Sequence, residues 1–227
     1  MALLRRWSCL AIAVCVAGSI AAAPIGTKVA AHSADASSSY GIAKKRGISR
    51  EAVKLHDKLL RVWSDHAIWS WQYTVSKLEG LENQQAVANR LQRNLRDISQ
   101  VIGTYYGQEM SGELMKLLSQ HIQIAGKLIE AVKAGHQAEA EEYKRLWHKN
   151  AADIARFLSK LNPNWSYEEL KRMMNTHLQL MTEGLHAHLN KNWEAEIIAV
   201  DKNQHHLNEM ADMLALGIMK QSPKKFK

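Results

Sequence analysis

A polar motif that returns every 56 residues constrains the fold of this chain more than any other feature of its sequence. Its three copies are Asn94-x-x-Asp97, Asn150-x-x-Asp153 and, less strictly, His206-x-x-Glu209. A histidine lies 28 or 29 residues before each copy, and these histidines are His66, His121 and His177. The apolar residues around the motif keep the same register. A period of this length is typical of one supersecondary unit copied in tandem.

Each unit has the pattern of a helical hairpin. Apolar residues recur at steps of three and four from Ser49 onward, which is the spacing of amphipathic helices, and no segment alternates like a strand. Glycines suited to helix ends punctuate the pattern at Gly80, Gly107 and Gly135. We predict six helices, over residues 50–80, 84–106, 111–134, 137–161, 167–189 and 191–220. The predicted fold class is all-α: one domain over residues 49–221, a six-helix bundle built from three tandem helical hairpins.

The first residues have the pattern of a secretory signal peptide. Arg5 and Arg6 precede an apolar run that ends near Ala23 and is too short to span a membrane. We predict a signal peptide over residues 1–31, cleaved after Ala31, and export by the general secretory route to the cell envelope or the extracellular space. Residues 32–48 are rich in serine, alanine and glycine and are expected to form a flexible leader.

Removal of this peptide changes the chemistry that the chain can offer. Both cysteines, Cys9 and Cys15, would be lost, which excludes disulfides, thiolate metal sites and cysteine nucleophiles from the mature protein. Three basic residues and no acidic residue would be lost as well, so that 27 basic and 22 acidic side chains remain, a net charge of +5.

Part of this positive charge lies in a basic tail over residues 222–227. We expect the tail either to contact an anionic polymer of the cell envelope or to be a simple solvated terminus. No aromatic motif suited to stacking on bases accompanies the basic residues, so nucleic acid is not an expected partner. No transmembrane helix is expected in the mature chain.

The histidines and the asparagines of the motif fall within the apolar stripes of the predicted helices, with Asp97 and Asp153 at the margin. Burying an amide, an imidazole or a carboxylate without a partner costs several kcal/mol, so these groups must meet one another or a cation. Imidazole and carboxylate together suit iron, manganese or zinc. The candidate metal ligands are His66, His121, His177, His206, Asp97, Asp153 and Glu209.

A structural interpretation stands beside the metal site. In it, a histidine in each hairpin bonds to a carboxylate and is oriented by the asparagine, and the contact only fixes how the helices pack. The protein would then be a non-catalytic structural or interaction protein of the cell envelope or spore surface. Catalysis is not predicted under either interpretation, because no arrangement of a nucleophile with its base is evident.

The chain also resembles a known family in a set of short motifs. These are His66-x-x-Trp69, Ala88-Asn89-Arg90-Leu91, Tyr105-Tyr106-Gly107, His121-Ile122-x-Ile124-Ala125, Asn162-Pro163-Asn164-Trp165 and Met210-Ala211-Asp212-Met213-Leu214. The family consists of uncharacterised all-helical bacterial proteins, frequent in spore-forming Gram-positive bacteria, whose members often carry the automatic names acetylglutamate kinase or glycosyltransferase.

Neither of those names agrees with the residues. Both activities need a sheet and glycine-rich loops that bind phosphate, whereas the 12 glycines of this chain are scattered. The resemblance therefore implies an all-α protein and not a kinase or a transferase. A second, fainter likeness to ferritin-like helical bundles rests on His66 and Trp69 alone, and it implies a metal ion held inside a helical bundle.

Overall fold

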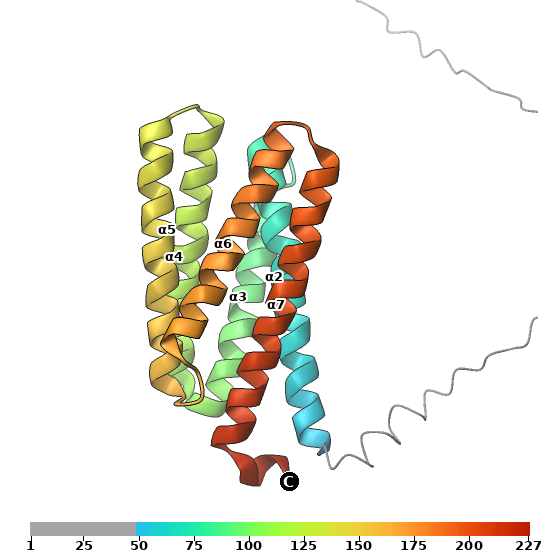
Figure 1. The fold of residues 1–227 in the computed structure, drawn as a ribbon, viewed down its shortest axis with the longest axis vertical. Coiled ribbons are helices and arrows are strands. Elements are labelled where there is room, and N and C mark those ends of the chain that lie inside the picture. Colours follow the sequence, from blue (N-terminus) through green and yellow to red (C-terminus); the bar gives the residue numbers. More distant parts are fainter. Residues whose placement is uncertain (1–48) are drawn as a thin grey trace, which may run out of the picture.

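The computed structural model describes residues 49–227 of the chain, and six long helices make up most of that part (Figure 1). They are α2 (Arg50–Glu79), α3 (Gln84–Tyr106), α4 (Gln108–Lys133), α5 (Gln137–Leu161), α6 (Tyr167–Leu189) and α7 (Trp193–Gln221), followed by the short 3-10 helix η1 (Pro223–Phe226). The described part contains no strand. The predicted all-α class is confirmed, while the predicted signal peptide and leader lie outside the described residues.

Glycine conformation sets two of the helix ends. Gly80 has a left-handed φ of 69°, and its N–H bonds to the carbonyl of Ser76, so α2 ends one residue before the predicted position. Gly107 has a φ of 93° and is the single residue between α3 and α4. Because this one residue makes the whole turn, α4 begins at Gln108, three residues before its predicted start.

Side-chain caps set two of the helix starts. Ser49 Oγ accepts a hydrogen bond from the N–H of Ala52 at 3.3 Å, which fixes the start of α2. The start of α7 lies two residues beyond its prediction, because Lys191 takes a φ of 55° in the turn. The side chain of Asn192 then caps the helix by accepting from the N–H of Ala195 at 3.1 Å.

Each helix packs along the helix that follows it, and α7 returns to pack along α2. Helix α2 also contacts α4 across the bundle. In Figure 1 the α4–α5 pair stands to one side of the view, with α6 between it and the α2–α7 pair. The turns between helices are short, so neighbouring helices run in opposite directions.

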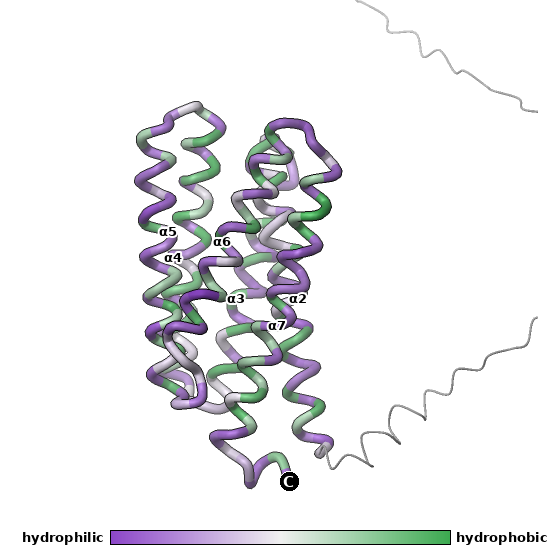
Figure 2. The backbone as a smooth tube through the Cα atoms, in the orientation of Figure 1, coloured by the Kyte–Doolittle hydropathy of each residue, from purple (hydrophilic) through white to green (hydrophobic). Residues whose placement is uncertain are grey.

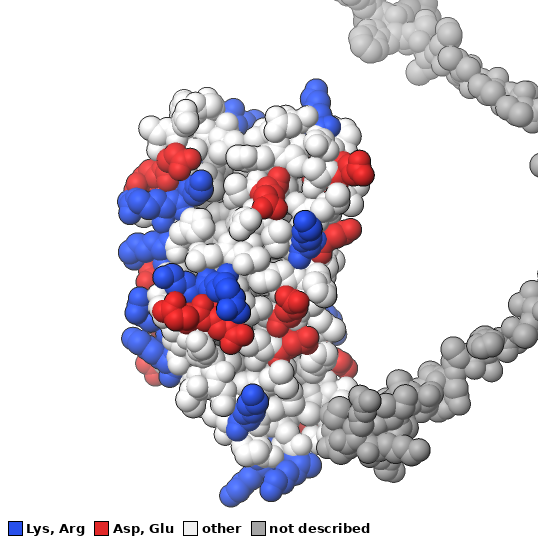
Figure 3. Space-filling view, in the orientation of Figure 1, with Lys and Arg blue, Asp and Glu red and all other residues white. Residues whose placement is uncertain are grey.

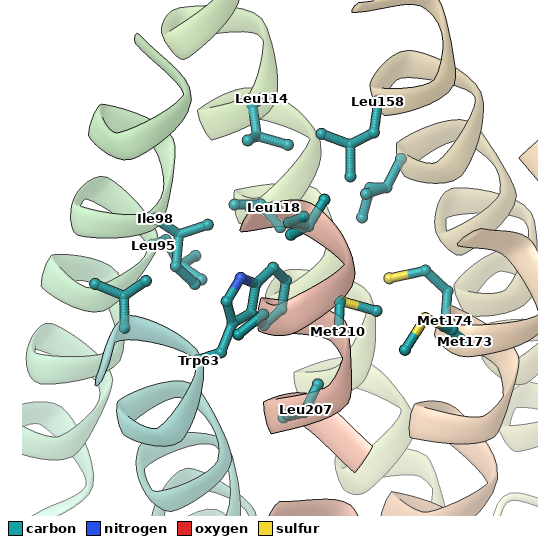
Figure 4. Close-up of a cluster of buried hydrophobic side chains, with 14 of the residues drawn as sticks. Trp63, Leu95, Ile98, Leu114, Leu118, Leu158, Met173, Met174, Leu207 and Met210 are labelled. Carbon is teal, nitrogen blue, oxygen red and sulfur yellow. The ribbon is translucent and has the colours of Figure 1, made fainter. Parts of the chain in front are cut away.

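The main core receives buried apolar side chains from all six helices, most of them leucine, isoleucine, methionine and alanine. Apolar positions alternate with polar ones along each helix (Figure 2), and the apolar side chains meet between the helices (Figure 4). Trp63, Leu118 and Met210 are among those that point into this space. Full burial of one such side chain contributes about 1.5–3 kcal/mol, so the apolar stripes themselves account for the assembly of the six helices.

The predicted basic tail folds back onto the bundle. Helix η1 packs on α2 and α7, and the ring of Phe226 stacks on that of Tyr105 with 6.1 Å between centroids. Lys225 Nζ lies 5.7 Å from the centroid of the same tyrosine ring. Basic side chains therefore gather at this end of the molecule (Figure 3). Over residues 49–227, no helix is both long enough and apolar enough to cross a bilayer.

Candidate functional site

Three of the seven predicted ligands meet in the middle of the bundle. His66 of α2, His121 of α4 and His177 of α6 are only 4%, 2% and 4% exposed. The centroid of the His177 ring lies 5.8 Å from that of His66 and 6.3 Å from that of His121. The three histidines come from alternate helices, one from each hairpin, and they form what we call the histidine cluster.

An asparagine from the next helix fixes each histidine of the cluster. The Nδ1 to Oδ1 distances are 3.0 Å for His66 and Asn94, 2.7 Å for His121 and Asn150, and 2.7 Å for His177 and Asn203. All three asparagines are buried. Each pair therefore joins the two helices of one hairpin through a buried hydrogen bond.

The asparagines also define which nitrogen of each ring carries the proton. Asn94 Nδ2 donates to the carbonyl of Val62 at 2.8 Å, and Asn150 Nδ2 donates to the carbonyl of Leu117 at 3.2 Å. Since the amide nitrogen is used in this way, the amide oxygen faces the ring and must accept from Nδ1–H. Nε2 of the neutral ring then carries a free lone pair.

In the third hairpin, one residue accepts the hydrogen bond from the histidine and a different residue donates to the backbone carbonyl. Asn203 Oδ1 accepts from His177 Nδ1, but its amide nitrogen faces Met181 Sδ at 3.5 Å. The carbonyl of Met173, four residues before His177, instead accepts from Nε2 of His206 at 2.8 Å. In the first two hairpins the corresponding carbonyl is likewise four residues before the histidine. His206 thus occupies the place that the 56-residue period gives it, but it bonds the backbone and does not join the cluster.

Burial keeps the cluster histidines uncharged at neutral pH. Desolvation lowers the pKa of His66 and of His121 from 6.5 to about 4, and the asparagine hydrogen bonds oppose this shift only in part. Desolvation together with the neighbouring His66 lowers the pKa of His177 to about 3. A neutral imidazole is the form that binds a metal ion.

The three rings line a small cavity of about 30 Å³ between the helices. Within the described residues, Nε2 of His121 and Nε1 of Trp147 are buried and have no hydrogen-bond partner. The Trp147 ring also lines the cavity, and its centroid lies 5.3 Å from that of His121. Because a single water needs roughly 10–15 Å³, the cavity has room for one small polar guest or ion beside these unpaired nitrogens.

The three predicted carboxylate ligands lie away from the cluster. Asp153 is paired with Lys149 at 2.9 Å on the surface, and Glu209 is exposed beside His205 and His206. Asp97 is half-buried at the edge of α3. Three residues advance an α-helix by about 300°, so a carboxylate three positions after an inward asparagine is turned toward the helix margin. The cluster histidines therefore do not contact these three carboxylates, and an asparagine amide takes the expected place of the carboxylate.

The ring positions do not yet form a closed metal site. Over residues 49–227, no group of three or more His, Asp or Glu side chains is placed to hold a metal ion as the side chains now lie. What the structure brings together is a set of three neutral imidazoles, each oriented through Nδ1, around one cavity. These features define the class of the protein as an all-α bundle with a buried, asparagine-oriented histidine cluster.

Sequence reasoning missed Asn203 and the tryptophan neighbours of the cluster. Asn203 lies 26 residues after His177, one helical turn short of the interval in the other hairpins. A shift of three residues keeps a side chain near the same helix face. This rule would have identified Asn203 as a candidate partner of His177. Trp63 and Trp147 each lie three residues before a member of a histidine–asparagine pair, and both pack against a cluster ring.

Comparison with known proteins gives no further guide. No protein-family model matches the chain, and neither the curated proteins nor the solved structures contain a significant match. The resemblance to the helical bacterial family therefore stays a prediction.

Proposed function

We propose that this protein is an exported helical bundle that binds one transition-metal ion through Nε2 of His66, His121 and His177. One observation carries the proposal: all three rings are neutral, buried, and held through Nδ1 by an amide oxygen, and all three line the same cavity. A metal-binding histidine almost always donates its second ring N–H to an oxygen acceptor, which fixes the ring and its tautomer. The asparagines supply such acceptors.

Metal binding requires the rings to move closer together. With metal–nitrogen distances of about 2.0–2.1 Å, the ring centroids of two ligands lie about 5 Å apart. The separations of the His177 ring from those of His66 and His121 are 5.8 and 6.3 Å, so these two pairs must each close by about 1 Å. The cavity between the rings gives the space for this closure, and the unpaired Nε2 of His121 gains a partner by it.

The donor set favours zinc or iron over manganese. Imidazole suits zinc and iron, whereas manganese prefers carboxylate and other oxygen ligands. Asp97, Asp153 and Glu209 lie outside the cluster, so the proposed ligand set contains only nitrogen. Three protein ligands leave a fourth coordination position open, as in zinc sites that bind water or a substrate.

The structural interpretation remains the second candidate, and a specific observation favours it. Each histidine already has a good hydrogen bond to an asparagine, and each of these bonds joins two helices. Such pairs can fix helix register without any ion. The protein would then serve as a non-catalytic structural or interaction protein of the cell envelope or spore surface.

Metal content distinguishes the two candidates. We expect the purified protein without an affinity tag to hold about one equivalent of zinc or iron, or to take it up on reconstitution, when measured by plasma mass spectrometry after gel filtration. His121→Ala should lose this metal. His205→Ala is the matched control, because its side chain is 79% exposed and lies outside the cluster. A folded wild type that retains no metal after reconstitution would support the structural candidate instead.

A further inference from the structure

A polar groove lies between α5 and α6. Its volume is about 690 Å³, within the range of roughly 300–1,000 Å³ that small-molecule sites occupy. The lining contains polar and charged side chains only, namely Lys144, His148, Glu168, Lys171, Arg172, Asn175, Thr176, Gln179, Thr182 and Glu183. We call it the α5–α6 groove. Figure 3 shows basic and acidic side chains close together on this side of the molecule.

The cations of the groove lie within about one helical turn of the contact between His148 and Asn175, and between the two carboxylates of the lining. The two lining carboxylates, Glu168 and Glu183, are separated by 15 residues of α6, which is roughly 22 Å along the helix axis. Lys171 and Arg172 lie between them on the same helix. Across the groove, α5 presents Lys144 and His148, and His148 meets Asn175 in the middle of that span.

The cations of the groove are only weakly neutralised by the protein. The closest acidic partners of Lys144 and Arg172 are Glu141 and Glu169, each at 3.8 Å and each outside the groove lining. Over residues 49–227, Lys171 forms no ion pair, and its Nζ lies 5.8 Å from the centroid of the Tyr167 ring. Three cationic groups therefore remain available to an anionic group placed between α5 and α6.

Amide, hydroxyl and imidazole groups suited to binding hydroxyls lie among these cations. His148 Nδ1 lies 2.9 Å from Asn175 Oδ1, so in the neutral ring Nδ1 donates and Nε2 is left as an acceptor. Gln179 is held by Glu183 at 2.8 Å, and the hydroxyls of Thr176 and Thr182 complete the lining. Amide, hydroxyl and imidazole groups can each donate or accept when the ligand carries alcohols.

We propose that the α5–α6 groove is a binding site for a small organic phosphate with several hydroxyl groups, of the size of a sugar phosphate. Lys144, Lys171 and Arg172 bind the phosphate, and the amides, threonines and His148 bind the hydroxyls. Arginine and lysine are the side chains that recognise phosphate through charge-assisted hydrogen bonds. This site does not depend on the proposed metal ion.

The distribution of charge selects a single phosphate over an anionic polymer. A polymer that runs along the groove would bring its next phosphates toward Glu168 at one end and Glu183 at the other, where like charges repel. A long polyanion also needs cations repeated along its path, whereas the cations of this groove lie only between its two carboxylates.

Calorimetric titration of the chelator-treated full protein tests the site with glucose 6-phosphate as the probe. We expect glucose 6-phosphate to bind at one saturable site and glucose, which lacks the phosphate, not to bind. The double variant K171Q/R172Q should bind glucose 6-phosphate at least tenfold more weakly than the wild type. Lys160→Gln is the matched control, because it removes a charge from an exposed position of α5 outside the groove, and it should bind as the wild type does.

Three outcomes would overturn the proposal. They are the absence of binding by the wild type, an equal loss in Lys160→Gln, and an affinity for polyphosphate that rises with its length. Circular dichroism of each variant shows whether it is folded, and both substituted side chains of the double variant lie at the surface of α6. Because the metal is removed beforehand, failure here leaves the proposal for the histidine cluster untouched.

Discussion

Asn150 has two hydrogen-bonding tasks in the buried cluster. Its oxygen accepts from His121 Nδ1 at 2.7 Å, and its nitrogen donates to the carbonyl of Leu117 at 3.2 Å. An aliphatic side chain could fill the volume but would leave the Nδ1–H of His121 without an acceptor and would remove the second hydrogen bond to the Leu117 carbonyl. The amide is thus the smallest group that meets both demands, which explains why asparagine and not aspartate occupies this inward position.

Asn150→Ala should lower the free energy of unfolding by about 1–3 kcal/mol, the cost of leaving the buried Nδ1–H of His121 without its acceptor. Urea unfolding at pH 7 measures the change. Asp153→Asn is the matched control on the same helix, where the surface pair with Lys149 at 2.9 Å contributes about 0–1 kcal/mol. Similar losses in the two variants would show that the inward amide has no special role.

Helix α7 approaches the loop before α6 so closely that one of its residues must be glycine. The indole of the buried Trp165 lies directly against Gly217, where any Cβ atom would overlap the ring. The indole fills the space that a side chain would occupy. This contact fixes the position of α7 along its axis relative to the α5–α6 loop. That position determines which residues of α7 face His177.

Gly217→Ala should therefore destabilise the protein by about 1–3 kcal/mol or more, the usual cost of overpacking. Gly112→Ala is the opposite case in α4, since nothing lies within 4 Å of the added Cβ, and the better helix former should stabilise by up to about 1 kcal/mol. Thermal unfolding of both variants measures whether each substitution lowers or raises the stability. Destabilisation by both would point to backbone strain instead of a side-chain clash.

The ends of three helices meet at another histidine. His188 of α6 faces Glu196 of α7 through Nδ1 at 2.9 Å and Glu79 of α2 through Nε2 at 3.1 Å. Its ring also packs edge-on against those of Trp71 and Trp193. This contact joins α2, α6 and α7 near one end of the bundle, whereas the histidine cluster joins α2, α4 and α6 in the middle.

The cluster makes the stability of the whole bundle depend on pH. The folded-state pKa values of about 4, 4 and 3 lie below the value of 6.5 expected in the unfolded chain. Between these limits the unfolded chain binds protons that the folded chain cannot, so the free energy of unfolding decreases as the pH falls. The stabilising contribution is complete above pH 6.5 and is lost toward pH 4.

We expect a loss of about 1.4 kcal/mol per pH unit for each cluster histidine, or about 4 kcal/mol per unit for all three, in urea unfolding of the metal-free protein between pH 6 and pH 4.5. His121→Gln should reduce this slope by about one third. His205→Gln serves as the control, because its ring is exposed and lies outside the cluster. A wild-type slope no steeper than that of His121→Gln would contradict the buried neutral state.

Much of the architecture could be predicted from the residues. The three- and four-residue apolar spacing identified all six helices, because each stripe must be buried and only neighbouring helices can cover it. Helix ends were less accurate where a single residue such as Gly107 made the whole turn. The inward placement of His66, His121 and His177 followed from the same stripes, while the inward turn of Asp97, Asp153 and Glu209 did not occur.

The sequence by itself determined which residues must leave water, and therefore the all-α class and the burial of three histidines in a core rich in leucine. Only the tertiary structure decided which polar groups meet. The register between two helices depends on how their side chains interlock, and a shift of one turn replaces His206 by Asn203 beside His177. Periodicity along one helix does not contain that information, because it arises from contacts between helices.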